Sequence, residues 1–425
     1  MILFKIKIEG EEIMMFKVWY STESFADFII NNTKLKEYKL EKNKIYESDA
    51  NNQKNFHTMP DHIKEILYLD APDLIVELNS EPIFSIEIST EAGTGHNAFQ
   101  RFARIAASVE KNVPAFYIYP EAAIITRTIK GKDIVKWDSI NPLVFKALDE
   151  VMNIYNVPAL LYYFPTDYRS FINPFDSPNF STKGLKYNKE VEYAGCPDDK
   201  DDDIQNLFSA INEVIINVIS EGVIEGRNNL MSNLKIREQR AIMQEEYFKK
   251  GGSLDSSPLT STIEIPTKLL LDYLNRYESS YYEVGSLLKG RENTIIYMVD
   301  AKFRGDPYPG CLAAIDYLKC REGKTFEERK NNLVMVWGKA SVIEDTLVIE
   351  SSKGTSINDF ISDVKMCGSK NLLTKEYSEL KNEDIPRYYM QVRHGSTYSK
   401  VKHIRVYSYF ADAIIFKDGS LWRDG

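Results

Sequence analysis

In the first 120 residues, the spacing of apolar and polar positions predicts a mixed α/β sheet. Apolar residues alternate with charged ones over 2–8 and are predicted to return as a second strand over 13–20. After Pro60 the pattern predicts, in order, a short helix, two strands, an amphipathic helix and a third strand, over 61–68, 74–76, 83–88, 97–111 and 114–119. This order is typical of a sheet in which a helical crossover leads to the next strand.

A similar order recurs in the last part of the chain. The pattern predicts a helix, a strand, a second helix and a second strand, over 267–277, 294–299, 312–320 and 332–337. Residues 280–284 fit either a strand or the end of the first of these helices. Alternation of apolar and polar residues returns over 401–410 and 413–416, which predicts further strands.

Between these two parts the chain is first polar and then helical. Residues 168–203 are rich in Pro, Asn, Ser and Asp and are predicted to form a surface loop, with Asp203 as the N-cap of the next helix. Apolar residues at helical spacing continue that helix over 204–219, and a charged helical stretch runs on to a Gly-Gly-Ser linker at 251–253. We therefore expect an N-terminal domain, an acidic loop with a helical spacer, and a C-terminal domain, over 1–175, 176–256 and 257–425.

Composition narrows the class of protein. The 53 Lys and Arg residues against 62 Asp and Glu give a net charge of −9, which argues against a protein that coats nucleic acid through bulk charge. The acidic net charge does not exclude an enzyme whose basic residues are confined to a cleft. No apolar run reaches the roughly 20 residues of a membrane span, and the alternating start differs from a signal peptide. Four cysteines without CxxC spacing favour a reducing, cytoplasmic location.

Two acidic residues accompany the first predicted strand pair. Asp73 opens one strand, and Glu87 lies near the end of the next. A tight hairpin would bring both carboxylates to one edge of the sheet. Carboxylate oxygens are the ligands that Mg²⁺ prefers, and Mn²⁺ is expected to substitute. An ion held there would polarise a phosphoryl oxygen and acidify a water for in-line attack on a phosphodiester.

A second candidate site lies in the C-terminal part. Asp300 and Lys302, two residues apart after an apolar run, are expected to point to the same face of a strand. The Asp300 carboxylate would bind metal, and the Lys302 ammonium would orient the attacking water or offset charge on the phosphate. Glu283, across a Gly-containing turn, is the predicted second acidic ligand, with Glu292 as the alternative.

Both segments resemble the PD-(D/E)xK nuclease superfamily, to which many restriction endonucleases belong. In the N-terminal segment, Pro72, Asp73 and Glu87 match the family's Pro-Asp and second acid, and Ser89 stands where the family has its lysine. The resemblance covers roughly residues 60–120 and 278–340. It implies two restriction-endonuclease-like mixed-sheet cores of the order helix–strand–strand–strand–helix–strand (αβββαβ), joined by a helical middle segment.

The C-terminal segment, Asp300-Ala-Lys302-Phe-Arg304, resembles the Asp-Ala-Lys-Tyr-Arg variant of the signature without an obvious Pro-Asp. By the same resemblance, Lys111 on the following helix would take the place of the missing N-terminal lysine. His96, just before that helix, is another candidate to position a water or a phosphate. The residues expected to face DNA are His96, Gln100, Arg101, Arg104, Lys111 and Arg304.

The resemblance implies a Mg²⁺-dependent endodeoxyribonuclease of the restriction or phage-defence type that cuts double-stranded DNA as a monomer or homodimer. One site in each domain would cut one strand each. The departures from the signature keep two alternatives open. One is a nickase with only the C-terminal site active, and the other is a non-catalytic nucleic-acid-binding or regulatory protein on a degenerate nuclease fold.

Overall fold

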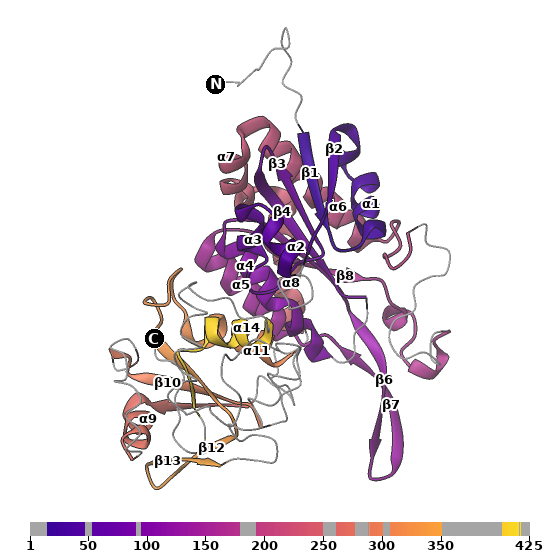
Figure 1. The fold of residues 1–425 in the computed structure, drawn as a ribbon. Helices are drawn as coiled ribbons and strands as arrows, with labels where there is room; N and C mark the ends of the chain where they lie inside the picture. The colour runs from indigo at the N-terminus through magenta and orange to yellow at the C-terminus, as the bar shows by residue number, and fades with distance from the viewer. Residues whose placement is uncertain are drawn as a thin grey trace.

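Two mixed sheets, one in each half of the chain, organise the fold (Figure 1). The computed structural model describes residues 15–46, 53–90, 95–178, 193–249, 261–276, 288, 290–300, 307–350, 402–415 and 417. The strand predicted over 2–8 and the candidate site residues Glu283, Lys302 and Arg304 lie outside these residues. Within the described part, the chain is a mixed α/β protein, as the pattern predicts.

The first sheet has six strands in the order β2-β1-β3-β4-β5-β8. They are β1 (Met15–Tyr20), β2 (Lys39–Lys44), β3 (Leu74–Leu78), β4 (Glu81–Ile88), β5 (Ala115–Pro120) and β8 (Ala159–Phe164). β3 and β4 form an antiparallel pair, and β5 and β8 add to it in parallel. The turn between β3 and β4 is Asn79-Ser80, with both φ angles positive at 54° and 66°, which is typical of a tight two-residue hairpin.

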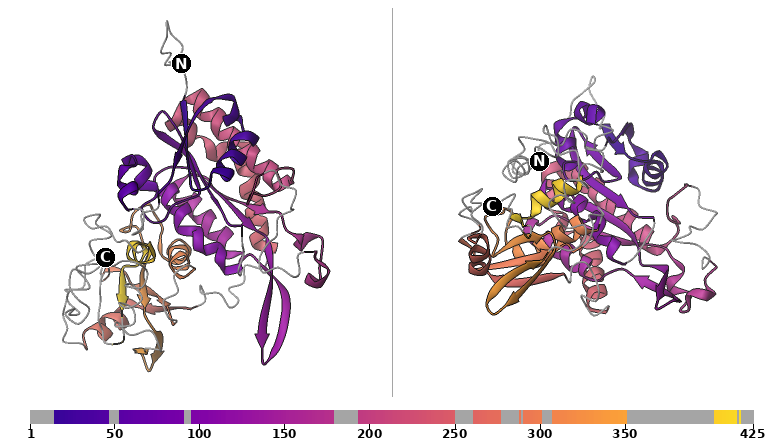
Figure 2. Two further views of the ribbon diagram at one scale, coloured as in Figure 1. Left: turned by 45° about the vertical axis from the view of Figure 1, so that its right-hand side comes forward. Right: turned by 60° about the horizontal axis from the view of Figure 1, so that its bottom comes forward.

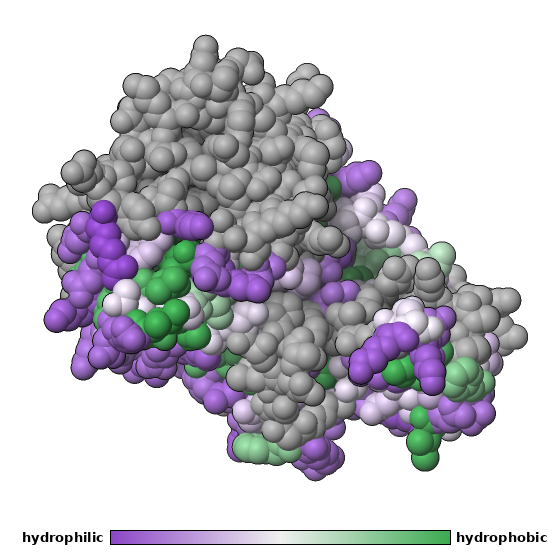
Figure 3. Space-filling model, turned by 90° about the horizontal axis from the view of Figure 1, so that it is seen from below, coloured by the Kyte–Doolittle hydropathy of each residue, from purple (hydrophilic) through white to green (hydrophobic). Residues whose placement is uncertain are grey.

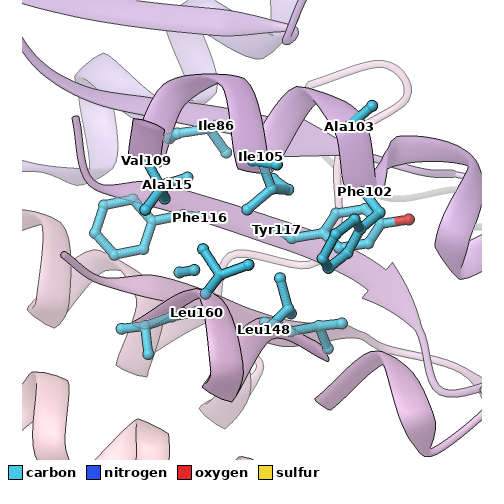
Figure 4. Packing of buried hydrophobic residues seen from close by; sticks show 14 of the residues in the cluster. Ile86, Phe102, Ala103, Ile105, Val109, Ala115, Phe116, Tyr117, Leu148 and Leu160 are labelled. Carbon is cyan, nitrogen blue, oxygen red and sulfur yellow. The ribbon is translucent and has the colours of Figure 1, made fainter. Parts of the chain in front are cut away.

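Helices that follow the strands pack on this sheet. α4 (Phe102–Glu110) contacts β4 and β5, and α5 (Leu143–Tyr155) contacts β8. Figure 4 shows Ile105 of α4 facing Leu148 and Leu160 in one apolar core. The segment predicted as a spacer packs here too, because α6 (Asp202–Glu221) and α8 (Leu234–Lys249) both contact β8.

The second sheet has four strands in the order β14-β11-β10-β9. They are β9 (Thr262–Pro266), β10 (Asn293–Met298), β11 (Asn331–Val336) and β14 (Ala413–Ile415). β9 and β10 are antiparallel, whereas β10, β11 and β14 are mutually parallel. The candidate strand at 280–284 lies outside the described residues, and β9 is the observed antiparallel partner of β10.

Two local predictions are wrong. The N-cap of α6 is Asp201 and not Asp203, since the Asp201 carboxylate accepts a hydrogen bond from the backbone N–H of Asp203 at 3.0 Å. Lys402–Phe410 form a helix, α14, where alternation predicts a strand. Val406 and Phe410, four residues apart, are both buried, and α14 packs against α11 (Tyr308–Ile315). Burial at helical spacing therefore overrides the local alternation.

The same order of elements occurs in both halves. An antiparallel pair (β3–β4 or β9–β10) is followed by a helix (α4 or α11), a parallel strand (β5 or β11), a hairpin, a second helix (α5 or α14) and a last parallel strand (β8 or β14). The hairpins are β6–β7 (Ala122–Ile129, Lys132–Ser139) and β12–β13 (Lys339–Ile343, Thr346–Glu350). One difference is α9 (Thr267–Leu274), which lies between β9 and β10. We call residues 15–249 the N-terminal unit and residues 261–417 the C-terminal unit.

The two units pack through corresponding helices (Figure 2). α11 of the C-terminal unit contacts α4 and the preceding 3₁₀ helix η2 (Gly95–Arg101) of the N-terminal unit. The rings of Phe102 and Tyr317 lie 5.8 Å apart across this junction. Gly310 of α11 approaches the backbone of η2 so closely that a β-carbon there would lie 1.7 Å from the carbonyl oxygen of Phe99.

Buried ion pairs complete the junction. Arg321 pairs with Asp316 at 2.8 Å and with Glu110 of α4 at 3.3 Å. Arg329 pairs with Asp316 at 2.8 Å and with Asp412 at 2.9 Å. All five side chains are buried or nearly so. Because Glu110 belongs to the N-terminal unit, the network joins the two units.

No helix in the described ranges is long and apolar enough to cross a membrane. Figure 3 shows one face of the molecule, where the coloured surface is largely hydrophilic and the hydrophobic residues gather in small separate areas.

We predict that Gly310→Ala destabilises the protein by about 1–3 kcal/mol, because the added methyl group meets backbone that has no rotamer to change. Helix propensity alone would make the alanine variant more stable by about 1 kcal/mol. The predicted loss of stability therefore comes from the contact of the added methyl group with the backbone of η2. Gly290→Ala is the matched control, since a β-carbon there meets no atom within 4 Å. Urea unfolding of both variants measures the difference. Equal stabilities for the two would contradict this close packing of α11 on η2.

Candidate functional site

The structure brings Asp73 and Glu87 together. The β3–β4 register pairs Leu74 with Ile86, so Asp73 and Glu87 face each other one position further along. Asp73 precedes the first residue of β3, and Glu87 is the penultimate residue of β4. The negative charge of Asp73 contributes to raising the pKa of Glu87, which reflects their proximity.

Asp73 is fixed by two hydrogen bonds. Its Oδ1 accepts a bond from the Ser21 hydroxyl at 2.9 Å, and its Oδ2 accepts one from the backbone N–H of Ile88 at 3.0 Å. The backbone carbonyl of Asp73 also accepts the N–H of Ser21 at 2.9 Å. These bonds tie Asp73 to β4 and to the residue that directly follows β1, so its position is set at the ends of two strands of the sheet.

Glu87 is held by arginines. Its side chain is fully buried, and Arg104 Nη1 donates to both of its carboxylate oxygens at 2.9 Å. Arg101 Nε lies 3.1 Å from the Oε1 of Glu87. Arg104 is itself 5% exposed, and its Nε donates to Asp70 Oδ2 at 2.8 Å. A buried chain of alternating charges, Asp70–Arg104–Glu87–Arg101, therefore runs from the loop before β3 to the start of α4.

The environment of Glu87 opposes its ionisation. Burial raises the pKa of Glu87 to about 8, even though the positive charges of Arg104 and Arg101 lower it. Burial alone would lower the pKa of Arg104, but the negative charges of its neighbours Asp70 and Glu87 raise the pKa well above its ordinary value. An ionised Glu87 thus depends on the two guanidinium groups, because a buried carboxylate without a partner is strongly unfavourable.

The other predicted residues of the N-terminal site lie in different surroundings. Ser89, at the position where the PD-(D/E)xK pattern has lysine, is buried with its hydroxyl 3.5 Å from the Tyr117 hydroxyl. Lys111 follows the last residue of α4 and pairs with Glu65 at 2.9 Å. Gln100 is half-buried in η2 beside Arg101. The backbone of His96 belongs to η2, and its side chain lies outside the described part.

The C-terminal site is described only in part. Asp300 follows β10 by two residues, and its Oδ2 lies 3.2 Å from Lys339 Nζ at the start of β12. These two side chains line a hollow of about 330 Å³ together with Ser261, Met298, Ala340, Ser341 and Glu350. Glu292 precedes β10, at the opposite end of the strand from Asp300, so this alternative ligand is not brought to the site.

Sequence reasoning missed Asp70, Lys339 and Glu350. Asp70 stands three residues before Asp73, but no spacing rule identifies it as a partner of Arg104. Lys339 and Glu350 are paired across the β12–β13 hairpin, whose two strands were not predicted. The structure describes no cluster of three or more His, Cys, Asp or Glu side chains with metal-binding geometry within its ranges.

Comparisons with known proteins gave no match to any family model, any curated protein or any solved structure.

We predict that Arg104→Met destabilises the protein by about 3–5 kcal/mol, because it leaves Glu87 and Asp70 buried beside a neutral side chain. Lys111→Met is the matched control near the other end of the same helix. Its ion pair with Glu65 is about half exposed, so the expected loss is about 0–1 kcal/mol. Chemical unfolding at neutral pH measures both. A loss for Arg104→Met no larger than for Lys111→Met would show that the buried charge chain contributes little.

Proposed function

We propose that this chain is a metal-dependent endonuclease that acts on double-stranded DNA, with one candidate site in each unit. The observation that carries the proposal is the repeated order of elements, with acidic side chains at the carboxyl end of the second strand in both copies: Glu87 on β4 and Asp300 just after β10. An antiparallel strand pair, a helix and a parallel strand in that order, with an acid at this end, fit the resemblance to PD-(D/E)xK nucleases.

The donor chemistry of the N-terminal site fits Mg²⁺ or Mn²⁺. Asp73 and Glu87 offer carboxylate oxygens from facing positions on adjacent strands. Two carboxylates have about eight lone-pair sites between them, and the contacts above leave several unused. These two residues would hold the ion, which when bound would acidify water and polarise a phosphoryl oxygen. In the C-terminal unit Asp300 would hold an ion, with the predicted ligand Glu283.

The positive side chains at each site have separable tasks. Arg104 is buried, orients the Glu87 carboxyl group and favours its ionised form, so we assign it a positioning role and not a DNA contact. Arg101, with a quarter of its side chain exposed, is placed to meet a phosphate of the DNA backbone. Lys339, beside Asp300 and largely exposed, would offset charge that develops on the phosphate in the C-terminal unit.

A second candidate function is a nickase in which only the C-terminal site cleaves. It is favoured by the contacts of Glu87, whose carboxylate already has two guanidinium partners, and by Ser89 in place of the lysine. In that case the N-terminal unit would bind DNA without cutting it. A protein that binds nucleic acid with no cleavage at either site is the non-catalytic alternative.

We predict that the wild-type chain linearises supercoiled plasmid in Mg²⁺ or Mn²⁺, and that Glu87→Gln and Asp300→Asn each leave a nicked circle, because one strand is then uncut. Gel electrophoresis of plasmid forms over time measures this. Glu238→Gln, which removes an exposed carboxylate from α8, is the control and should linearise like wild type.

The other outcomes separate the alternatives. Loss of all cleavage in Asp300→Asn, with Glu87→Gln unchanged, would assign the chemistry to the C-terminal unit alone. Absence of nicked or linear product with either metal, from a folded protein that binds the plasmid, would refute the endonuclease proposal.

A further inference from the structure

The β6–β7 hairpin projects from the N-terminal unit as a two-stranded ribbon (Figures 1 and 2). Each strand has eight residues, which corresponds to about 26 Å at 3.3 Å per residue. The described side chains near its turn are mostly exposed to solvent. Near its base, Trp137 donates to the carbonyl of Phe171 at 2.8 Å and its ring lies 5.5 Å from that of Tyr168.

The exposed part of the hairpin carries its positive charges on one face. Lys132 and Lys136 are four residues apart on β7 and therefore point to the same side of the ribbon, together with the exposed Ile134. Lys130 lies in the turn with φ of 49°. Within the described ranges, none of these three ammonium groups has a carboxylate partner.

The nearest acidic residue on the outer half belongs to the other face. Asp133 alternates with Lys132 along the strand, and its carboxylate accepts a hydrogen bond from Thr128 Oγ1 at 2.6 Å. Asp138, two residues after Lys136, shares the lysine face at the base of the hairpin. The two β7 lysines outnumber this one carboxylate, so the face keeps a net positive charge, with the apolar Ile134 between its cations. Such a surface is suited to a polyanion with some apolar contact.

The corresponding hairpin of the C-terminal unit shows that the fold does not require this surface. β12–β13 also follows the middle parallel strand and also has a two-residue turn with both φ angles positive, Glu344 at 48° and Asp345 at 54°. Its turn is acidic, and Leu347 and Ile349 are buried in a core with Leu270 of α9. The β12–β13 hairpin thus packs on the body of its unit and is acidic at its turn, whereas the outer part of β6–β7 is exposed and basic at its turn.

We infer that the β6–β7 hairpin is an arm that contacts the groove and phosphates of double-stranded DNA. A two-stranded ribbon fits the major groove of B-form DNA, and 26 Å corresponds to roughly 8 base pairs at 3.4 Å each. The deep, narrow major groove of A-form RNA does not admit such a ribbon, which favours DNA as the ligand. Lysines position a protein on phosphates, and Ile134 provides apolar contact with base edges.

The location of the arm links it to the candidate site. β6 begins two residues after β5 ends, and Tyr117 of β5 is the register partner of Glu87. The arm therefore starts from the end of the sheet that carries Asp73 and Glu87. DNA held along the arm would run past these two residues. The choice of DNA as the polyanion rests on the proposed function, whereas the basic face itself does not.

The experiment measures the binding of DNA in EDTA, which removes the divalent metal that the proposed cleavage requires. Fluorescence anisotropy with a labelled DNA duplex of about 30 base pairs, in EDTA, compares wild type with the triple variant Lys130→Gln/Lys132→Gln/Lys136→Gln. We expect binding to be at least about tenfold weaker at moderate salt. The slope of log K against the logarithm of salt concentration should also be smaller in magnitude by about 3, one for each lost phosphate contact. Lys36→Gln/Lys39→Gln/Lys44→Gln, at and beside the opposite edge strand β2, changes the net charge equally and should bind like wild type.

Each remaining outcome has a definite meaning. Equally weakened DNA binding in both triple variants would show that bulk charge causes the effect. Wild-type affinity in the hairpin variant would show that its three lysines do not contact DNA. Either result would overturn the proposal that the hairpin is a DNA-binding arm. In either case the endonuclease proposal stands. Competition by an RNA duplex or by polyglutamate as effective as by unlabelled DNA would overturn the assignment to DNA. Failure of the wild type to bind any DNA duplex at low salt would refute both the arm and the proposed function.

Discussion

Paired burial of opposite charges is the constraint on which this structure depends. At the junction of the two units, carboxylates and guanidinium groups alternate in a buried network made of Glu110, Arg321, Asp316, Arg329, Asp412 and Arg291. Three positive and three negative groups balance, so no buried charge is left without a partner. Removing one member of such a network costs far more than its net contribution to stability. The pair of Arg321 with Glu110 crosses between the units, so the network stabilises their junction.

The same physical arrangement recurs at the candidate site, with a different consequence. The chain Asp70–Arg104–Glu87–Arg101 orients a carboxyl group whose pKa burial raises to about 8, although the two guanidinium groups favour its ionised form. A divalent cation would share Glu87 with the two arginines. The N-terminal carboxyl groups are therefore held by more contacts than Asp300, and more positive charge lies beside them. Asp300 has one exposed lysine partner among the described residues. Under the proposed function, this asymmetry between the two units distinguishes a two-site endonuclease from a nickase.

Much of the local structure follows from the sequence because it depends on local pattern. The strands β3, β4, β5, β10 and β11 overlap their predicted ranges, since apolar runs bounded by turn residues specify them directly. The facing positions of Asp73 and Glu87 follow from a short hairpin. The ion pairs of Arg104 with Asp70 and Glu87 could not be predicted from the sequence, because tertiary packing alone brings these three residues together. The helix α14 was missed for the same reason: its buried side is defined by α11, which is distant in sequence.

The central claim is that two related units each hold a metal ion through the carboxylates at the end of their second strand. Anomalous diffraction from crystals soaked in Mn²⁺ locates such ions directly. The account predicts one peak between Asp73 and Glu87 and another at Asp300. Anomalous density at neither position, in crystals where Mn²⁺ is bound elsewhere on the surface, would contradict it.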